Sequence, residues 1–153
     1  MQILFPILAS QTNEKKMKEF VQNKLTKYHY EFSERGNTIS TKLGFGLVNT
    51  IYFHNDGSIT INNELKSWNH LTGLIDMSLK SSMIYQSVSL LIATIIFSRI
   101  DDVNLPINIF LLFIGGAIYT LIWTFYYFIK AENFNKQIIE WCDTVDIKPN
   151  YTI

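Results

Sequence analysis

The sequence predicts an α+β protein with a small N-terminal cytoplasmic β-α-β-meander domain, a two-helix transmembrane hairpin and a C-terminal amphipathic helix. Two uncharged runs in the second half of the chain, 81–98 and 103–129, predict the hairpin. Before them, apolar residues change from helical spacing to alternation, which is typical of a helix followed by a sheet. The expected units are the domain 1–63, a stalk helix 64–80, transmembrane helices 81–100 and 109–129 with an external turn 101–108 between them, and a cytoplasmic helix and tail 130–153.

The N-terminal domain is expected to begin with a strand at Gln2 to Leu8, followed by a helix from Thr12 to about Tyr28. The helix is predicted because Met17, Phe20, Val21, Leu25 and Tyr28 recur at helical spacing. Alternating apolar residues then predict a meander of four strands, at about 28–33, 38–45, 49–54 and 58–62.

Two local signals support the meander. Asn55, Asp56 and Gly57 form a strong hairpin signal between the last two strands. Gly44 and Gly46 bracket Phe45 and favour a bulge or sharp bend there, since no phosphate-loop sequence follows them.

One face of the predicted N-terminal helix is rich in lysine. A solvated helix face is the favoured interpretation, because Glu14 and Glu19 dilute the charge. The alternative is contact with anionic lipid headgroups at the cytoplasmic leaflet. The lysines concerned are Lys15, Lys16, Lys18, Lys24 and Lys27.

The segment 64–80 is expected to form an amphipathic stalk helix that leads into the first span. Apolar residues recur there at helical spacing, although Gly73 costs roughly 1 kcal/mol of helix propensity. A second stripe follows the second span, which suggests a paired stalk. Trp68 on the first stripe and Trp141 on the second are interpreted as packing anchors, or alternatively as contacts for a partner. The two stripes are Leu65, Trp68, Leu71, Ile75 and Leu79, and Phe134, Ile138, Trp141, Cys142 and Val145.

The second uncharged run carries most of the membrane prediction. A helix rises about 1.5 Å per residue, so residues 109–129 are long enough for a hydrocarbon layer of roughly 30 Å. Its twelve Ile, Leu and Phe residues favour insertion by roughly 5 kcal/mol, and the first run by roughly 3 kcal/mol. A buried core helix is the alternative for each run, but a chain of 153 residues has little interior for two of them.

Basic residues predict the orientation, with both termini cytoplasmic. The connection Arg99 to Asn108 carries one Arg and two Asp, whereas lysines lie on the other side of both runs. Pro106 disfavours helix at Leu105, so the connection is expected to be a short turn. Lysine outnumbers arginine eleven to two, which is compatible with an AT-rich microbial gene. A bacterial inner membrane is therefore expected, with an organelle membrane as the alternative.

Within the spans, two groups of residues have predicted roles. Aromatic residues near the cytoplasmic ends are expected to form an interfacial belt: Tyr85, Trp123, Tyr126 and Tyr127. Small residues are expected to pack helices together, within one hairpin or between copies: Ser89, Ala93, Gly116, Thr120 and Thr124. Gln86 is the one strongly polar side chain in the spans, and it is expected to bond across helices or line a narrow polar path.

The sequence shows no signature of a reaction, so an enzyme is not predicted. The histidines His29, His54 and His70 have no metal-ligand spacing, and no cofactor or metal is expected. His54 and Asp56 are expected to share a local hydrogen bond in a turn. Cys142 is the single cysteine, which excludes an intrachain disulfide, and the formal net charge of zero gives no indication of nucleic-acid binding.

Three functional classes therefore remain. The favoured one is a membrane-anchored accessory or interaction protein, such as a complex subunit or an immunity or exclusion factor, that binds a protein partner. The second is a ligand-sensing effector whose hairpins form homo-oligomers and open a pore or perturb the bilayer. The third, least favoured, is an enzyme of unrecognised chemistry.

Overall fold

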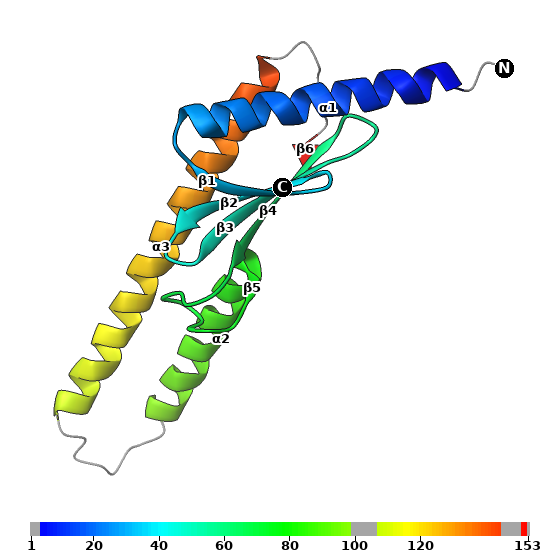
Figure 1. The fold of residues 1–153 in the computed structure, drawn as a ribbon. Coiled ribbons are helices and arrows are strands. Elements are labelled where there is room, and N and C mark those ends of the chain that lie inside the picture. Colours follow the sequence, from blue (N-terminus) through cyan, green and yellow to red (C-terminus); the bar gives the residue numbers. More distant parts are fainter. Residues whose placement is uncertain (1–3, 99–106, 145–150, 153) are drawn as a thin grey trace.

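The structure is a computed structural model that describes residues 4–98, 107–144 and 151–152. It is α+β, as predicted, with a mainly antiparallel sheet and three helices among these residues. Figure 1 shows helix α1 crossing the C-terminal part of α3 beside the sheet, while α2 and the N-terminal part of α3 project together away from it. The helices are α1 (Leu4–Lys27), α2 (Leu79–Ser98) and α3 (Ile107–Asp143).

The sheet has the strand order β1-β2-β3-β4-β5, and each neighbouring pair is antiparallel. A further short strand, β6, pairs in parallel with the start of β4. The predicted four-strand meander is confirmed, with boundaries that differ by a few residues. The strands are β1 (Glu31–Arg35), β2 (Thr38–Gly44), β3 (Leu47–Phe53), β4 (Ile59–Leu65), β5 (Met77–Ser78) and β6 (Tyr151–Thr152).

The core lies between one face of the sheet and the two helices α1 and α3. Alternate strand residues such as Ile39, Ile51 and Ile61 are buried on this face. Met17, Val21 and Leu25 cover them from α1, and Phe134 and Ile138 from α3. The other face carries the exposed side chains of Lys42, Tyr52 and Asn62.

The predicted first strand is wrong, because α1 begins at Leu4 and continues without interruption to Lys27. A run of apolar residues suits either a strand or a helix. The stripe Met17, Val21 and Leu25 is anchored in the core, and helix formation is cooperative once such a segment is in place. Pro6 lies in the first turn, where its missing N–H would have no partner inside the helix.

Both local signals in the meander are confirmed. Gly57 has a φ of 82° in the turn between β3 and β4, and the chain bulges where the register shifts between Lys42 and Gly44. The expected hydrogen bond between His54 and Asp56 is replaced by two others. Asp56 Oδ1 accepts from the N–H of Ser58 at 2.8 Å, and His54 Nε2 bonds Thr60 Oγ1 at 2.9 Å. The bonds from the Ser58 side chain and backbone hold the pKa of the Asp56 carboxyl below its usual value.

The predicted stalk helix 64–80 is also wrong. Strand β4 continues to Leu65, residues 66–76 form a loop, and β5 precedes the start of α2. We name residues 66–76 the junction loop. Ser67 and Gly73 have φ values of 60° and 66°, which a helix does not allow, and Asn69 and Gly73 exchange two backbone hydrogen bonds. Ser78 Oγ accepts from the N–H of Ser81 at 3.1 Å and caps α2.

Among the described residues, one helix meets the length and hydropathy of a membrane span. It is α2, whose segment Leu79–Ile96 has a mean hydropathy of 1.4 and is 11% buried. The two-span hairpin is therefore not established by the fold. The predicted second span 109–129 and the C-terminal helix are parts of the single helix α3, which begins at Ile107 inside the expected turn. The rest of that turn, 101–106, and most of the tail, including Val145, lie outside the described residues.

Candidate functional site

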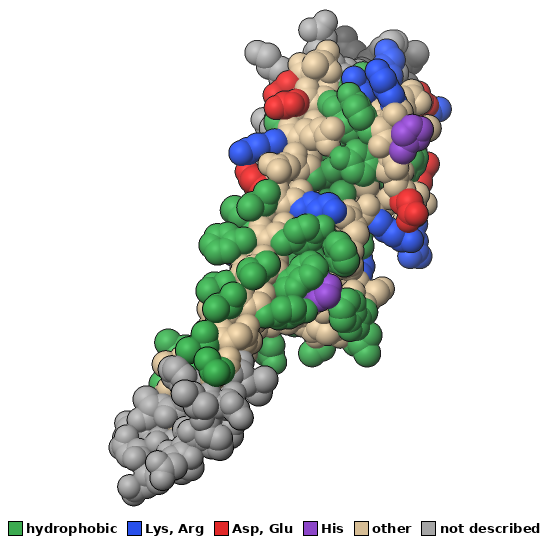
Figure 2. All heavy atoms as spheres, turned by 90° about the vertical axis from the view of Figure 1, so that its left-hand side faces the viewer, with side chains coloured by type: hydrophobic (Ala, Val, Ile, Leu, Met, Phe, Trp, Pro, Cys, Tyr) green, Lys and Arg blue, Asp and Glu red, His purple; other side chains and the backbone are tan. Residues whose placement is uncertain are grey.

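Helix α3 has two halves with opposite surroundings. In its C-terminal half, Ala131, Phe134 and Ile138 are buried in the core of the domain. In its N-terminal half, large apolar side chains such as Ile122 and Phe125 are 61% and 62% exposed. Figure 2 shows hydrophobic side chains gathered over the part of the molecule that projects from the domain, whereas charged side chains lie over the domain. The place where these surroundings change is the candidate functional region.

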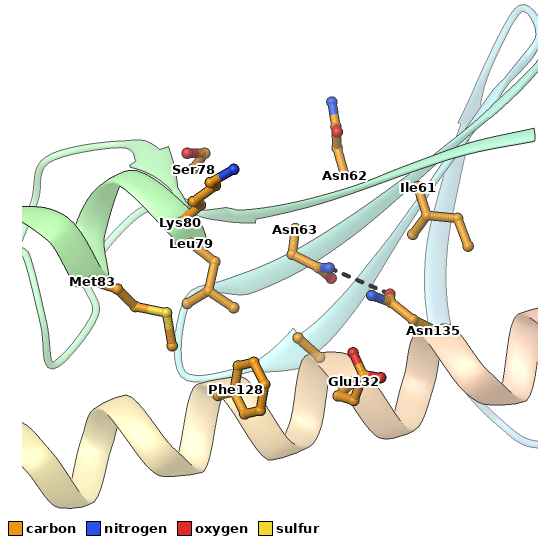
Figure 3. A pocket seen from close by; sticks show the side chains of 11 residues that line it. Ile61, Asn62, Asn63, Ser78, Leu79, Lys80, Met83, Phe128, Glu132 and Asn135 are labelled. Atoms are coloured by element: carbon orange, nitrogen blue, oxygen red, sulfur yellow. Dashed lines mark hydrogen bonds between the residues drawn. The ribbon is translucent and has the colours of Figure 1, made fainter. Parts of the chain in front are cut away.

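A cavity of about 460 Å³ lies in this region, between β4, the start of α2 and the middle of α3 (Figure 3). Its walls are largely apolar, with amide groups toward the sheet and one cation and one anion among the other lining residues. These residues include Ile61 and Asn63 of β4, Leu79, Lys80 and Met83 of α2, and Phe128, Glu132 and Asn135 of α3.

Three asparagines join the sheet to α3 beside the cavity. Asn49 Nδ2 donates to Asn63 Oδ1 at 2.9 Å and to Asn135 Oδ1 at 2.8 Å. Asn63 Nδ2 donates to Asn135 Oδ1 at 3.3 Å, and Figure 3 shows this bond. Asn49 Oδ1 is buried and has no hydrogen-bond partner among the described residues, which is unusual for a native core. These amide groups can bind a polar ligand but supply no acid, base or nucleophile.

Sequence reasoning missed the asparagine triad, although the strands carried a signal for it. Asn49 and Asn63 stand on the alternating positions that point to the core, where an apolar residue is expected. A polar residue at such a position needs a buried partner. The partner, Asn135, is more than seventy residues away in the chain, so no local pattern links the three.

An aromatic cluster on the other side of α3 holds the junction loop against the helix. The His70 ring stacks on Trp123, with ring centroids 3.5 Å apart, and His70 Nδ1 bonds Tyr119 Oη at 2.6 Å. Tyr127 Oη accepts from the His70 N–H at 3.1 Å and donates to the carbonyl of Phe45 at 2.6 Å. One hydroxyl therefore fastens both the bulge and the junction loop.

This arrangement corrects part of the predicted interfacial belt. Tyr127 is fully buried, so it belongs to the core and not to a lipid interface. Trp123 and Tyr126 are partly buried, and Lys130 Nζ donates to Tyr126 Oη at 3.0 Å. Tyr85 is 53% exposed on α2 and is the one of the four whose ring lies largely free on the surface.

Replacing Tyr127 with phenylalanine is expected to lower the free energy of unfolding by about 1–3 kcal/mol, because the His70 N–H and the Phe45 carbonyl both lose a partner. Thermal unfolding of the protein in detergent measures the effect. Tyr85→Phe is the matched control, since it removes a hydroxyl from an exposed ring. Equal melting temperatures for the two variants would contradict the fastening role of Tyr127.

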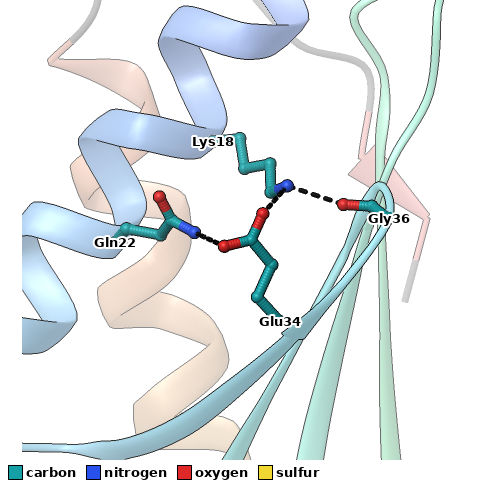
Figure 4. Close-up of polar contacts among 4 residues, drawn as sticks. All are labelled: Lys18, Gln22, Glu34 and Gly36. Carbon is teal, nitrogen blue, oxygen red and sulfur yellow. Dashed lines mark hydrogen bonds and ion pairs between the residues drawn. The ribbon is translucent and has the colours of Figure 1, made fainter.

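The five predicted headgroup lysines do not form one free face. Figure 4 shows Lys18 bonded to Glu34 and to the carbonyl of Gly36, with Gln22 also donating to Glu34. The hydrogen bond from Lys18 holds the pKa of the Glu34 carboxyl below its usual value. Lys24 lies over the Phe20 ring at 5.2 Å, whereas Lys15, Lys16 and Lys27 are exposed. Three lysines thus remain available for lipid, and the predicted contact stays a prediction.

The small residues of the predicted spans are only partly buried by contacts among the described residues. Ser89, Ala93, Thr120 and Thr124 are half-buried. A Cβ atom added at Gly116 would meet nothing within 4 Å, so this glycine does not permit a close helix contact inside the molecule. Gln86 donates to the backbone carbonyl of Leu71 in the junction loop instead of bonding across helices.

The two tryptophans proposed for partner contact have different surroundings. Trp141 is 7% exposed and stacks on Tyr28 with ring centroids 5.3 Å apart, so it acts as a packing anchor of the domain. Trp68 is 57% exposed on the junction loop. Only Trp68 therefore keeps the surface that a partner contact needs.

The Cys142 thiol is expected to be unreactive in the folded protein. It is buried, and desolvation raises its pKa to about 12, so it remains protonated at neutral pH. A thiol reagent at pH 8 should label Cys142 only after denaturant is added. Since the pKa is higher in the folded state, this group contributes stability below its unfolded pKa of about 8.5, and the contribution is lost as pH rises toward 12. Rapid labelling without denaturant would contradict the described burial.

Among the described residues, no group of three or more His, Cys, Asp or Glu side chains is placed to hold a metal ion. No family model matches the chain, and no curated protein or solved structure shows a significant match.

Proposed function

We propose that the protein is a membrane-anchored accessory or interaction protein that presents its α+β domain at the cytoplasmic face through a two-helix hairpin. One observation carries this proposal. Helix α3 is a single helix of 37 residues with an exposed apolar half and a half buried in the domain core. Because the helix is continuous, no flexible linker separates the proposed membrane anchor from the domain. The domain is therefore held at a fixed distance from the membrane and in a fixed orientation.

The second span is proposed from the same helix. Residues 107–129 carry no charged side chain, and apart from Trp123, Tyr126 and Tyr127 the large apolar side chains of this part of α3 are about as exposed as those of α2. Such a surface is unfavourable in water but suits hydrocarbon. Lys66, Lys80 and Lys130 lie where both helices meet the domain, which supports a cytoplasmic domain and, with the lysine-rich composition, a bacterial inner membrane.

The partner surface is proposed to be the sheet face opposite the core. Lys42, Tyr52 and Asn62 are exposed on this face, and β1 forms an edge of the described sheet. An open face and an open edge are surfaces on which another protein can add contacts or a strand. The charged residues of this region favour a polar, exchangeable interface over a permanently buried one.

Gentle extraction of the tagged protein followed by native mass spectrometry tests this proposal. A photo-crosslinking residue at Tyr52 should capture a defined foreign subunit, whereas the same residue at Lys16 on α1 should not. The protein should also stay with the membrane after an alkaline wash. Release by that wash, or equal crosslinking at both positions, would overturn the proposal.

The cavity supports the second candidate, a ligand-sensing effector whose hairpins assemble in the membrane. Its amide groups can bind a polar ligand at the point where β4, α2 and α3 meet, so binding there can be relayed to both membrane-facing helices. Native mass spectrometry should then show a closed homo-oligomer with a bound small molecule.

A cavity-filling variant tests this second candidate. Ala131→Phe places a ring among the residues that line the cavity. If the co-purified molecule makes the protein release dye from liposomes, this variant should abolish the release. Ile122→Phe on the exposed part of α3 is the control. Unchanged leakage with Ala131→Phe, or no leakage with the unmodified protein, would exclude the hypothesis of a ligand-sensing effector.

A further inference from the structure

The junction loop exposes more apolar surface than a loop in water normally does. Trp68, Leu74 and Ile75 are 57%, 79% and 56% exposed, and Phe45 in the neighbouring bulge is 54% exposed. Loops are usually polar, and large exposed apolar groups that lie close together indicate an interaction surface. We name these four side chains, Trp68, Leu74 and Ile75 of the junction loop and Phe45 of the bulge, the apolar tip.

The loop is stiff although its tip is exposed. Asn69 is 1% exposed, and its Oδ1 accepts from the N–H groups of Leu71 at 3.1 Å and Thr72 at 2.8 Å. Its Nδ2 donates to Thr72 Oγ1 at 2.8 Å and to the Gly73 carbonyl at 3.1 Å. Asp76 Oδ1 accepts from the Ser67 N–H at 2.8 Å and closes the loop at its base. These hydrogen bonds fix the backbone of the junction loop, which carries three of the four side chains of the apolar tip.

Contacts with both helices place the loop beside the anchor. Gln86 of α2 donates to the Leu71 carbonyl, and His70 contacts Trp123 and Tyr119 of α3. Tyr119 lies eight residues, roughly 12 Å, before the buried Tyr127 of α3, so this contact lies at the border between the domain and the exposed apolar half of the helix. If α2 and α3 cross a membrane, the loop therefore lies at its cytoplasmic border, beside the first turns of α2 and the middle of α3.

We propose that the junction loop is a third membrane contact, seated in the cytoplasmic lipid interface with its apolar tip among the upper acyl chains. This inference rests on the proposed membrane anchoring. The surface that the loop contacts is the bilayer around α2 and α3, because Gln86, which bonds the loop, directly follows the exposed apolar residues Ile84 and Tyr85 on α2.

Charge supports a lipid occupant. Lys80 and Lys130 lie at the domain end of the uncharged parts of α2 and α3, where anionic headgroups would be, whereas Lys66 at the base of the loop is paired with Glu64 at 2.6 Å. Lysine stems can extend along apolar surface while their ammonium groups reach the headgroup layer. The interfacial belt then consists of Trp68, Phe45, Tyr119 and Trp123, one or two turns deeper along α3 than Tyr126 and Tyr127.

The three tryptophans of the chain provide the test. The full-length protein is reconstituted in phosphatidylcholine vesicles brominated near the head or near the end of the acyl chain. Trp123→Phe with Trp141→Phe leaves Trp68 as the single reporter, and we expect strong quenching by the shallow bromines and weaker quenching by the deep ones. Trp68→Phe with Trp123→Phe leaves the buried Trp141 as a negative control, and Phe125→Trp in a tryptophan-free background reports on α3 itself.

The outcomes separate the two proposals. Quenching at position 125 with Trp68 as unquenched as Trp141 would overturn the junction-loop inference and leave the membrane anchor standing. No quenching at either position 68 or 125 would overturn both. Where the tryptophan variants do not fold, a nitroxide at Leu74→Cys with Cys142→Ala answers the same question. Its collision rate should be high with oxygen and low with a water-soluble nickel complex, and the reverse result would overturn the inference.

Discussion

Replacing Ile138 with alanine is expected to lower the free energy of unfolding by about 2–5 kcal/mol. Ile138 is fully buried on α3 and belongs to the core between the sheet and the helices. Removing its outer carbons takes away apolar contacts and leaves a space that the sheet and α1 can fill only in part. Denaturant unfolding of the protein in detergent, followed by circular dichroism, measures the change.

Ile122→Ala is the matched control for this substitution. It is the same change on the same helix, but Ile122 is 61% exposed, so detergent or lipid contacts replace most of what is lost. We expect its effect to be under about 1 kcal/mol, as is usual for exposed positions. A similar loss for both variants would show that the two halves of α3 are not in different surroundings.

Replacing Gly46 with alanine is expected to be strongly destabilising and to displace the junction loop. Gly46 has a φ of 79°, and a Cβ there would approach the carbonyl oxygens of Lys66 and Trp68 to 2.8 Å and Asn69 Cβ to 2.9 Å. The left-handed conformation costs roughly 1–2 kcal/mol, and forcing the backbone apart typically costs about 1–3 kcal/mol more. Thermal unfolding and the emission of Trp68 report the two effects.

Gly57→Ala separates these two costs. Gly57 has a φ of 82°, close to that of Gly46, but a Cβ there would meet nothing within 4 Å. It should therefore show only the conformational cost and leave the emission of Trp68 unchanged. Equal destabilisation by the two alanines would mean that the bulge and the junction loop are not in tight contact.

The meander was predictable because its signals are local. Alternation in β2, β3 and β4 follows from one face being buried, and Gly57 follows from a turn that needs a positive φ. The helix over 12–27 was equally readable from the spacing of Met17, Val21 and Leu25. Each of these patterns depends on residues within a few positions of one another.

The two wrong predictions, the N-terminal strand and the stalk helix, have a common cause. The apolar start of the chain fits a strand or a helix, and the stripe from Leu65 to Leu79 matched a helix although its members belong to a strand, a loop and the next helix. Leu65 and Leu71 are buried because of contacts with distant elements, not because they share a helix face. Gly73 was the one local residue that argued against a helix, and in the structure it has a positive φ within the junction loop.

The sequence by itself determined the α+β class, the meander, the uncharged runs and the lack of a recognisable reaction motif, because these follow from composition and short-range spacing. Only the tertiary structure decided that Tyr127 and Trp141 are buried, that three distant asparagines meet beside a cavity, and that an apolar loop lies along both helices. The physical reason is that burial and hydrogen bonding between residues far apart in the chain depend on how the elements pack, which no local pattern encodes.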